Sequence, residues 1–202
     1  MSKCLVTGGA GFIGSHIVDE LIDLGNQVVV IDNESSDNDK YYWNPNSVNL
    51  KGDITDYSFM KKAIQGVEYI FHCAAESSIG KSINNPLKTA EINFLGTCVV
   101  LQCARELNVK RVIYSSTSSG YGSNPIPNHE EQPDDCLNPY SVSKIAGEKL
   151  CIMYTKLFNL NTIIFRYFNV FGERSPSKGQ YTPVTSIFIS QKNNGDPLTI
   201  FG

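Results

Sequence analysis

The chain reads Thr7-Gly8-Gly9-Ala10-Gly11-Phe12-Ile13-Gly14 near its N-terminus, directly after the apolar run Cys4–Val6. Gly8, Gly11 and Gly14 have the spacing G-x-x-G-x-x-G, a variant of the dinucleotide-binding fingerprint. Glycine permits a tight turn, lets the backbone approach a pyrophosphate and allows the next helix to pack close to the strand. The N-terminus of that helix presents N–H groups and a positive dipole end to an anion. The segment therefore predicts a strand, a phosphate-binding turn and a helix.

The rest of the chain repeats this order of an apolar run followed by a helical pattern. Strands are expected at Cys4–Thr7, Gln27–Asp32, Ser47–Lys51, Tyr69–Ala74, Arg111–Ser116 and Thr162–Tyr167, with a short strand at Leu198–Phe201. Helices are expected around Ile13–Ile22, Pro86–Leu107, Ser141–Leu157 and Pro183–Lys192, and loops at Asn33–Asn46 and Gly120–Asn138. Nearly continuous apolar runs are typical of strands buried on both faces. The pattern predicts an α/β fold with a Rossmann-type, doubly wound parallel sheet flanked by helices.

Composition excludes several classes of protein. The 202 residues carry 17 basic and 20 acidic side chains, a net charge of −3, and 41% are hydrophobic. This balance argues against intrinsic disorder and against nucleic acid or an anionic membrane as the main partner. The longest aliphatic run, Val28–Ile31, is too short to cross a membrane, and no signal peptide is apparent, so we expect a cytoplasmic protein. The six cysteines are scattered, which favours reduced core thiols and no metal site.

Two aspartates follow expected strands and suit a nucleotide. Asp32 ends the second strand, where a carboxylate accepts hydrogen bonds from both ribose hydroxyls of adenosine. It would repel the 2′-phosphate of NADP, so NAD is the expected cofactor. Asp53 follows the third strand and is suited to accept from the adenine amino group. A helix-capping role is the alternative, since Thr55-Asp56 also resembles a cap.

Tyr140 and Lys144 form a Y-x-x-x-K pair on one face of an expected helix. A phenol with a pKa near 10 is a poor base at neutral pH, but a neighbouring ammonium lowers that pKa. The pair then becomes an acid/base for an alcohol proton. Five consecutive hydroxyl residues, Ser115–Ser119, end the fifth strand, where open α/β sheets bind ligands. They are suited to donate to a carbonyl or alcohol oxygen.

Together these residues resemble the extended short-chain dehydrogenase/reductase family, in its nucleotide-sugar epimerase branch. The matching segments occur in family order at Thr7–Gly14, Asp32–Asn33, Gly52–Ile54, Phe71–Ala75, Tyr114–Gly122, Tyr140–Lys144 and Arg166–Gly172. The resemblance spans the entire chain. It implies transient oxidation at sugar C4 and return of the hydride to the other face, with NAD as cofactor and a nucleotide sugar such as a UDP-hexose as substrate.

The resemblance also implies a role for each matching position. For the cofactor these are Gly8, Gly11, Phe12, Ile13 and Gly14 at the pyrophosphate, Asp32 and Asn33 at the ribose, Asp53 and Ile54 at the adenine, Ala74, Ala75 and Ser115 along the cofactor path, and Asn93 near the nicotinamide. Thr117 would hydrogen-bond the sugar O4, Tyr140 would be the base, and Lys144 would bind the nicotinamide ribose and tune Tyr140. Asn169 would contact the substrate diphosphate or sugar.

Two features depart from the wider family. Ser118-Ser119 follow Thr117, where the 4,6-dehydratases carry Asp-Glu, so dehydration is disfavoured. Family members are also much longer. We therefore expect an NAD-binding domain at 1–172, only the start of a substrate domain at 173–202, and impaired epimerisation. A homodimer through the helices at Pro86–Leu107 and Ser141–Leu157 is a further expectation from the resemblance.

Two other functions remain open. One is a different activity on nucleotide sugars, such as reduction or decarboxylation. The other is a non-catalytic NAD-binding module, although the joint presence of Thr117, Tyr140 and Lys144 argues against it, because a sensor needs none of them.

Overall fold

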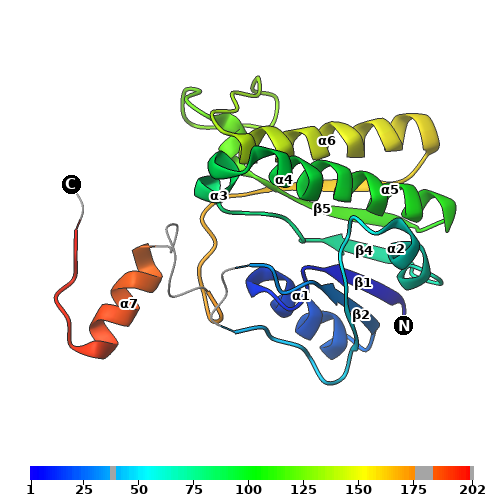
Figure 1. Cartoon of the computed structure of the whole chain (residues 1–202), viewed down its shortest axis with the longest axis horizontal. Helices are drawn as coiled ribbons and strands as arrows, with labels where there is room; N and C mark the ends of the chain where they lie inside the picture. Colours follow the sequence, from blue (N-terminus) through cyan, green and yellow to red (C-terminus); the bar gives the residue numbers. More distant parts are fainter. Residues whose placement is uncertain (37–39, 176–183, 201–202) are drawn as a thin grey trace.

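The computed structural model describes residues 1–36, 40–175 and 184–200, and within them one parallel sheet carries the fold (Figure 1). The strand order is β3-β2-β1-β4-β5-β6, with every neighbouring pair parallel. The strands are β1 (Lys3–Thr7), β2 (Gln27–Asp32), β3 (Val48–Lys51), β4 (Tyr69–His72), β5 (Arg111–Thr117) and β6 (Thr162–Tyr167). Strands β2 and β3 lie on one side of β1, and β4, β5 and β6 lie on the other. The strand order therefore reverses between β1 and β4. This is the Rossmann-type arrangement that the sequence predicts.

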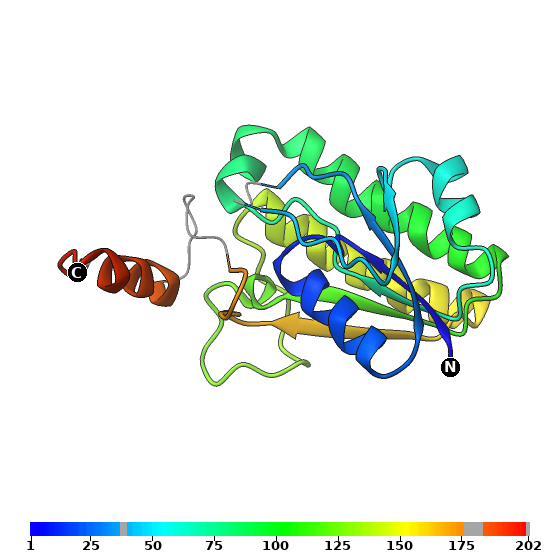
Figure 2. The ribbon, with the colours of Figure 1, turned by 90° about the horizontal axis from the view of Figure 1, so that it is seen from below.

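Helices cover both faces of the sheet (Figures 1 and 2). On one face α1 packs against β1 and β2, while on the other α2 and α6 flank α5, and α6 lies along β5 and β6. The helices are α1 (Phe12–Asp23), α2 (Tyr57–Ala63), α3 (Ile79–Asn84), α4 (Pro86–Ala90), α5 (Gly96–Glu106), α6 (Pro139–Phe158) and α7 (Val184–Asn194). In both views α7 lies apart from the sheet and its helices.

Alternate residues of the central strands build two cores. Leu5 and Ile31 point to the side of α2, α5 and α6, where they join the larger cluster of buried side chains. Val6 and Val30 point to the other side and pack with Val18 of α1. Because side chains alternate along a strand, continuous apolar runs bury residues on both faces.

The expected helix over Pro86–Leu107 contains a π-helical turn. The helix runs as α4, then the π-helical turn Glu91–Leu95, then α5. Such turns are rare and occur frequently at functional sites. The sequence pattern shows helical periodicity on either side of the turn but does not reveal it.

Other expected boundaries also differ from the structure. The strand β4 ends at His72 rather than Ala74, and the short helices α2 and α3 are not predicted from sequence. The strand expected at Leu198–Phe201 is wrong for Leu198–Ile200, which have no strand partner and are mostly exposed, and Phe201 lies outside the described residues. The start of the helix expected from Pro183 also lies outside them.

All six cysteines are free, as expected for reduced thiols. In the part of the chain that the structure describes, no helix is long and apolar enough to cross a membrane. Within the same residues, no group of three or more His, Cys, Asp or Glu side chains gathers as metal ligands.

Candidate active site

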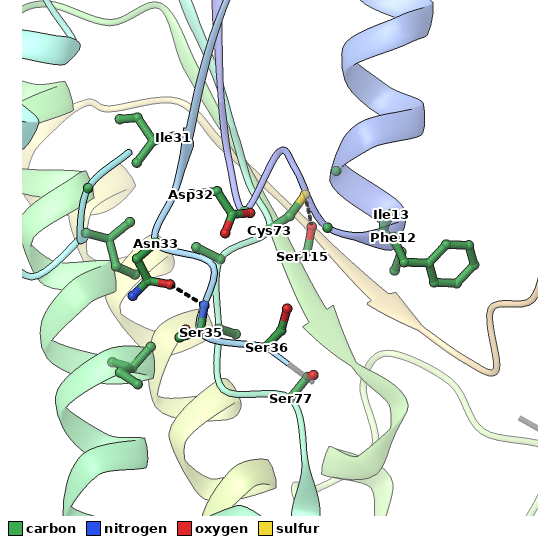
Figure 3. A pocket seen from close by; sticks show the side chains of 18 residues that line it. Phe12, Ile13, Ile31, Asp32, Asn33, Ser35, Ser36, Cys73, Ser77 and Ser115 are labelled. Atoms are coloured by element: carbon green, nitrogen blue, oxygen red, sulfur yellow. Dashed lines mark hydrogen bonds between the residues drawn. The ribbon is translucent and has the colours of Figure 1, made fainter. Parts of the chain in front are cut away.

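A pocket of about 240 Å³ opens at the carboxyl ends of the strands, where the order reverses between β1 and β4. Open α/β sheets bind their ligands at this point. In Figure 3, Asp32, Cys73 and Ser115 reach the pocket from the ends of three different strands around the glycine turn. The predicted site residues that line it are Gly8, Gly11, Phe12, Ile13, Gly14, Asp32, Asn33, Ile54, Ala74, Ala75 and Ser115.

A different structural reason explains why each of the three positions in the turn is a glycine. Gly8 has φ +66°, and a Cβ there would lie 2.8 Å from the backbone N of Ala74. A Cβ on Gly14 would lie 2.2 Å from the carbonyl oxygen of Gly8. Gly11 is the N-cap of α1 and provides no side-chain cap. The first N–H groups of α1 are thus available to an anion in the pocket.

Asp32 is buried at the pocket wall and is held by the backbone. Its Oδ2 accepts from the Ala10 N–H at 3.1 Å, and its Oδ1 accepts from the Glu34 N–H at 2.8 Å. Burial raises the pKa of Asp32, and these backbone hydrogen bonds oppose the rise. A carboxylate oxygen accepts more than one hydrogen bond, so this side chain can still receive a ribose hydroxyl. This carboxylate acceptor therefore fits the ribose hydroxyls at the adenosine end of NAD.

Asp53 does not line the pocket. Its Oδ1 accepts from the Thr55 N–H at 2.9 Å and from the Thr55 hydroxyl at 2.8 Å, while its Oδ2 accepts from Asn33 Nδ2 at 2.9 Å. The cap of α2 is instead Asp56, which accepts from the Phe59 N–H. Asp53 thus holds its own turn and orients Asn33 at the pocket edge.

The helix α6 presents Tyr140 and Lys144 one turn apart. Asn138 and Ser141 form a capping box, and Pro139 occupies the first turn, which fixes where the helix begins. The Tyr140 phenol lies near the side chain of Thr117, the last residue of β5, and the two groups interact. The structure therefore brings Thr117 and Tyr140 together, while Lys144 lies one turn along α6 with its ammonium over the ring of Tyr114.

The electrostatics of Tyr140 differ from the sequence-based expectation. Burial raises the pKa of Tyr140 above its ordinary value, and the interaction with Thr117 opposes the rise. The Lys144 ammonium lies 4.3 Å from the ring centroid of Tyr114. The expectation that the Lys144 ammonium lowers the pKa of Tyr140 is therefore wrong for this structure, because desolvation of the phenolate dominates and Lys144 is not among the groups that shift this pKa.

Lys144 is 3% exposed, and burial lowers its pKa to about 8. Attraction to Cys73, Cys151 and Glu148 opposes this decrease only in part. A buried ammonium with a depressed pKa destabilises the fold at neutral pH. Such a group is retained for a reason other than stability.

Lys144→Met should therefore raise the free energy of unfolding of the NAD-free chain by about 2–3 kcal/mol at pH 7. The folded pKa is lowered from 10.5 to about 8, so the wild type regains stability as the pH rises from 8 to 10.5, and the difference should shrink there. Urea unfolding at several pH values measures this. Lys149→Met is the control, since Lys149 lies on the same helix, is exposed and pairs with Asp134. A less stable Lys144→Met chain would contradict the interpretation.

A buried ion pair supports the strand end that carries Thr117. Arg166 Nε and Nη2 donate to Glu148 at 2.9 and 2.7 Å, and Nη2 also donates to Asp134 at 2.8 Å. The Glu148 carboxylate accepts a hydrogen bond from Ser116, the residue before Thr117. The hydrogen bonds from Arg166 to Glu148 and Asp134 raise the pKa of the Arg166 guanidinium. This network fixes β5 against α6 and β6.

Six predicted site residues are not among those that line the pocket, namely Asp53, Asn93, Thr117, Tyr140, Lys144 and Asn169. Asn93 is buried in the π-helical turn, and Asn169 is exposed beyond β6. Sequence reasoning also missed several lining residues, namely Ile31, Ser35, Ser36, Cys73, Ser77 and Ile92. Ser35 and Ser36 closely follow Asp32, and Cys73 and Ser77 flank Ala74 and Ala75. Proximity to these motif residues was the available signal.

Comparison with known proteins identifies relatives over nearly the whole chain. The family model described as NAD dependent epimerase/dehydratase family matches residues 4–202. A putative UDP-glucose 4-epimerase of Methanocaldococcus jannaschii is 38% identical over 98% of this chain and 65% of its own. A UDP-N-acetyl-alpha-D-glucosaminuronate decarboxylase of Bacillus cytotoxicus is 35% identical over 99% of this chain and 64% of its own.

Solved structures agree with these matches. A UDP-N-acetylglucosamine 4-epimerase from Methanobrevibacter ruminantium, in complex with UDP-N-acetylmuramic acid, superposes with a TM-score of 0.93 at 36% identity and covers 100% of this chain and 66% of its own. The UDP-glucose 4-epimerase of Thermus thermophilus, in complex with NAD, superposes with a TM-score of 0.87 at 32% identity over 98% of this chain and 65% of its own.

The chain spans about 65% of the length of the curated relatives that it matches. Its sheet order, glycine turn, Asp32 and Y-x-x-x-K helix agree with a family that uses NAD. On these grounds the chain belongs to the NAD dependent epimerase/dehydratase family.

Proposed function

We propose that this chain carries the cofactor and chemistry half of an NAD-dependent nucleotide-sugar 4-epimerase. The observation that supports it most directly is the proximity of the Thr117 side chain to the Tyr140 phenol, with Lys144 one turn along α6. The proposed substrates are UDP-glucose/UDP-galactose or the N-acetylated pair UDP-GlcNAc/UDP-GalNAc. Similarity to 4-epimerases of both kinds supports this choice.

In the proposed reaction, Thr117 and Tyr140 act at the sugar O4. The Thr117 hydroxyl orients this oxygen, and Tyr140 takes its proton as the C4–H bond breaks. NAD, when bound, supplies a hydride acceptor that is restored at the end of each turnover. Tyr140 then returns the proton after the 4-keto sugar has turned its other face to the cofactor. The buried ammonium of Lys144 would hold the nicotinamide ribose and favour the phenolate.

The other predicted roles extend this proposal. Gly8, Gly11, Gly14, Phe12 and Ile13 would hold the pyrophosphate, Asp32 with Asn33 the ribose, and Ile54 the adenine. Ala74, Ala75 and Ser115 would line the cofactor path, and Asn169 would contact the substrate. Asp53 and Asn93 would act through neighbours, since neither lines the pocket.

The division of the chain and its assembly are also proposals. Residues 1–172 would form the NAD-binding domain, and 173–202 would begin a substrate domain. A homodimer would pack α4, α5 and α6 against their copies. Leu87, Leu95 and Val142 support this surface, because each is exposed by 49% or more on these helices or the π-helical turn between them.

A second candidate is another reaction on a nucleotide sugar. Similarity to a UDP-sugar decarboxylase favours it, because the same oxidation at C4 serves both reactions. Ser118-Ser119 after Thr117 still disfavours dehydration.

The test mixes the chain, in excess over substrate, with NAD and each UDP-hexose, and identifies the products by chromatography. We expect only the 4-epimer, formed at least about 100-fold more slowly than by a full-length relative, since a third of the relatives' length is missing. A rate equal to that of a full-length relative would contradict the proposed impairment. A decarboxylated or reduced product would contradict 4-epimerisation.

A further inference from the structure

We infer that His72 is a positioning residue that ties the phosphate-binding turn to the helix carrying Tyr140. Only the part of this role that concerns Tyr140 rests on the proposed function. His72 ends β4 and does not line the pocket. It is 1% exposed, and its ring lies between β1 and α5, which carry the two side chains that it contacts.

Both ring nitrogens of His72 make hydrogen bonds. Nδ1 lies 2.7 Å from the Thr7 hydroxyl, and Nε2 lies 3.0 Å from the Thr97 hydroxyl. The Thr97 hydroxyl donates its proton to the backbone oxygen of Asn93 at 2.6 Å. Thr97 must therefore accept from His72, which places the ring proton on Nε2.

This tautomer also determines the direction of the hydrogen bond at Nδ1. Nδ1 is then an acceptor, so the Thr7 hydroxyl donates to it. The same hydroxyl accepts from the Ala74 N–H at 3.3 Å. Thr7 immediately precedes Gly8, and Ala74 lines the pocket. The hydrogen bond at Nδ1 thus holds the start of the phosphate-binding turn against the end of β4.

The hydrogen bond at Nε2 leads to the catalytic helix. Asn93, in the π-helical turn, donates from Nδ2 to the Ser143 hydroxyl at 2.9 Å. Ser143 donates in turn to the Tyr140 backbone oxygen at 2.8 Å. The Thr97 and Ser143 contacts fix the backbone and the side chain of the same asparagine. Hydrogen bonds to the backbone and from the side chain of Asn93 therefore link β1, through His72 and Thr97, to the backbone of Tyr140.

A neutral imidazole satisfies both ring nitrogens and also accepts the Thr7 hydroxyl proton. A protonated ring would donate to Thr7, whose oxygen also receives the Ala74 N–H, and the Thr7 hydroxyl proton would lose His72 as its acceptor. Burial, together with the nearby Lys144 ammonium, lowers the pKa of His72 to about 3. The ring therefore keeps this arrangement throughout the physiological pH range.

Nitrogen-15 NMR of the wild-type chain tests the arrangement directly. The chain has only three histidines, and His72→Gln identifies the signal of His72. We expect a neutral ring with the proton on Nε2 that does not titrate down to about pH 5. A proton on Nδ1, or titration near the ordinary histidine pKa of about 6.5, would overturn the inference. Neither result depends on epimerase activity.

Two amide substitutions separate the effect of the hydrogen bond at Nδ1 from that of the hydrogen bond at Nε2. His72→Asn places an amide near Nδ1 and retains the contact with Thr7, whereas His72→Gln reaches the Nε2 position and retains Thr97. We expect His72→Gln to weaken NAD binding about five- to tenfold and His72→Asn less than about twofold. Calorimetric titration with NAD measures both.

The opposite pattern is expected at Tyr140. Its phenol pKa is read from ultraviolet absorbance, after subtraction of the same titration in a Tyr140→Phe background. His72→Asn should raise this pKa, because a loosened α6 weakens the interaction with Thr117, while His72→Gln should not. Equal changes in both variants would indicate a general packing role and overturn the inference. If either fails to fold, Thr97→Val against Thr97→Ser and Thr7→Val against Thr7→Ser repeat the separation.

Discussion

Tyr140→Phe should lower the rate of UDP-hexose epimerisation by about 1,000-fold or more, while NAD affinity changes less than about threefold. Phenylalanine keeps the ring that fills this buried position and removes only the hydroxyl that meets Thr117. The proton of the sugar O4 then has no acceptor as hydride leaves C4. Conversion with the chain in excess over substrate, together with calorimetric NAD titration, measures both quantities.

Tyr57→Phe is the matched control for this substitution. It removes one hydroxyl that donates to Glu106 at 2.6 Å on α5, away from the pocket, and should leave the rate unchanged. An undiminished rate in Tyr140→Phe would exclude Tyr140 as the base. If Tyr140→Phe changed none of the measured properties, the result would favour the alternative of a non-catalytic NAD-binding module.

Gly14→Ala should weaken NAD binding by about 100-fold or more. The new Cβ would lie 2.2 Å from the Gly8 carbonyl oxygen and 2.8 Å from Gly9 Cα, both of them backbone atoms. Since no side chain can move aside, α1 must shift away from the turn, and its N–H groups lose their aim at the pyrophosphate. The same strain should lower the melting temperature by roughly 5 °C or more.

Gly25→Ala separates lost NAD binding from lost stability. Gly25 has φ +79° but no atom within 4 Å of an added Cβ, and it follows α1 at the end remote from the turn. Alanine there should cost about 1 kcal/mol of stability through backbone strain and leave NAD affinity unchanged. If Gly14→Ala bound NAD as tightly as Gly25→Ala, the proposed role of the glycine turn would be wrong.

The sheet was predictable because its strands carry their signal locally. Gln27–Asp32 and Thr162–Tyr167 are continuous or nearly continuous apolar runs, and both strands have these bounds in the structure. The glycine turn was also predictable, since Gly8 has φ +66° and a Cβ on Gly14 would meet the backbone of Gly8 and Gly9. The strand expected at Leu198 failed because a strand also needs a neighbour, which a local pattern cannot provide.

The site was predictable in its residue types but not in its environments. Spacing placed Tyr140 and Lys144 on one face of α6, as the structure has them. Spacing did not reveal that burial raises the pKa of Tyr140 and lowers that of Lys144, because burial depends on neighbouring elements. The π-helical turn around Asn93 and the contacts of His72 were hidden for the same reason, since they join residues from distant parts of the sequence.

The melting temperature of this chain with NAD, and with NADP as the control, tests the central claim most directly. Ligand at 100 times its dissociation constant adds about 2.7 kcal/mol, which corresponds to a rise of roughly 5–10 °C for a chain of this size. We predict this rise with NAD and none with NADP, because in the proposed role Asp32 would accept the ribose hydroxyls and repel a 2′-phosphate. Equal rises with both nucleotides, or no rise with NAD in protein shown to carry no bound cofactor, would contradict the account.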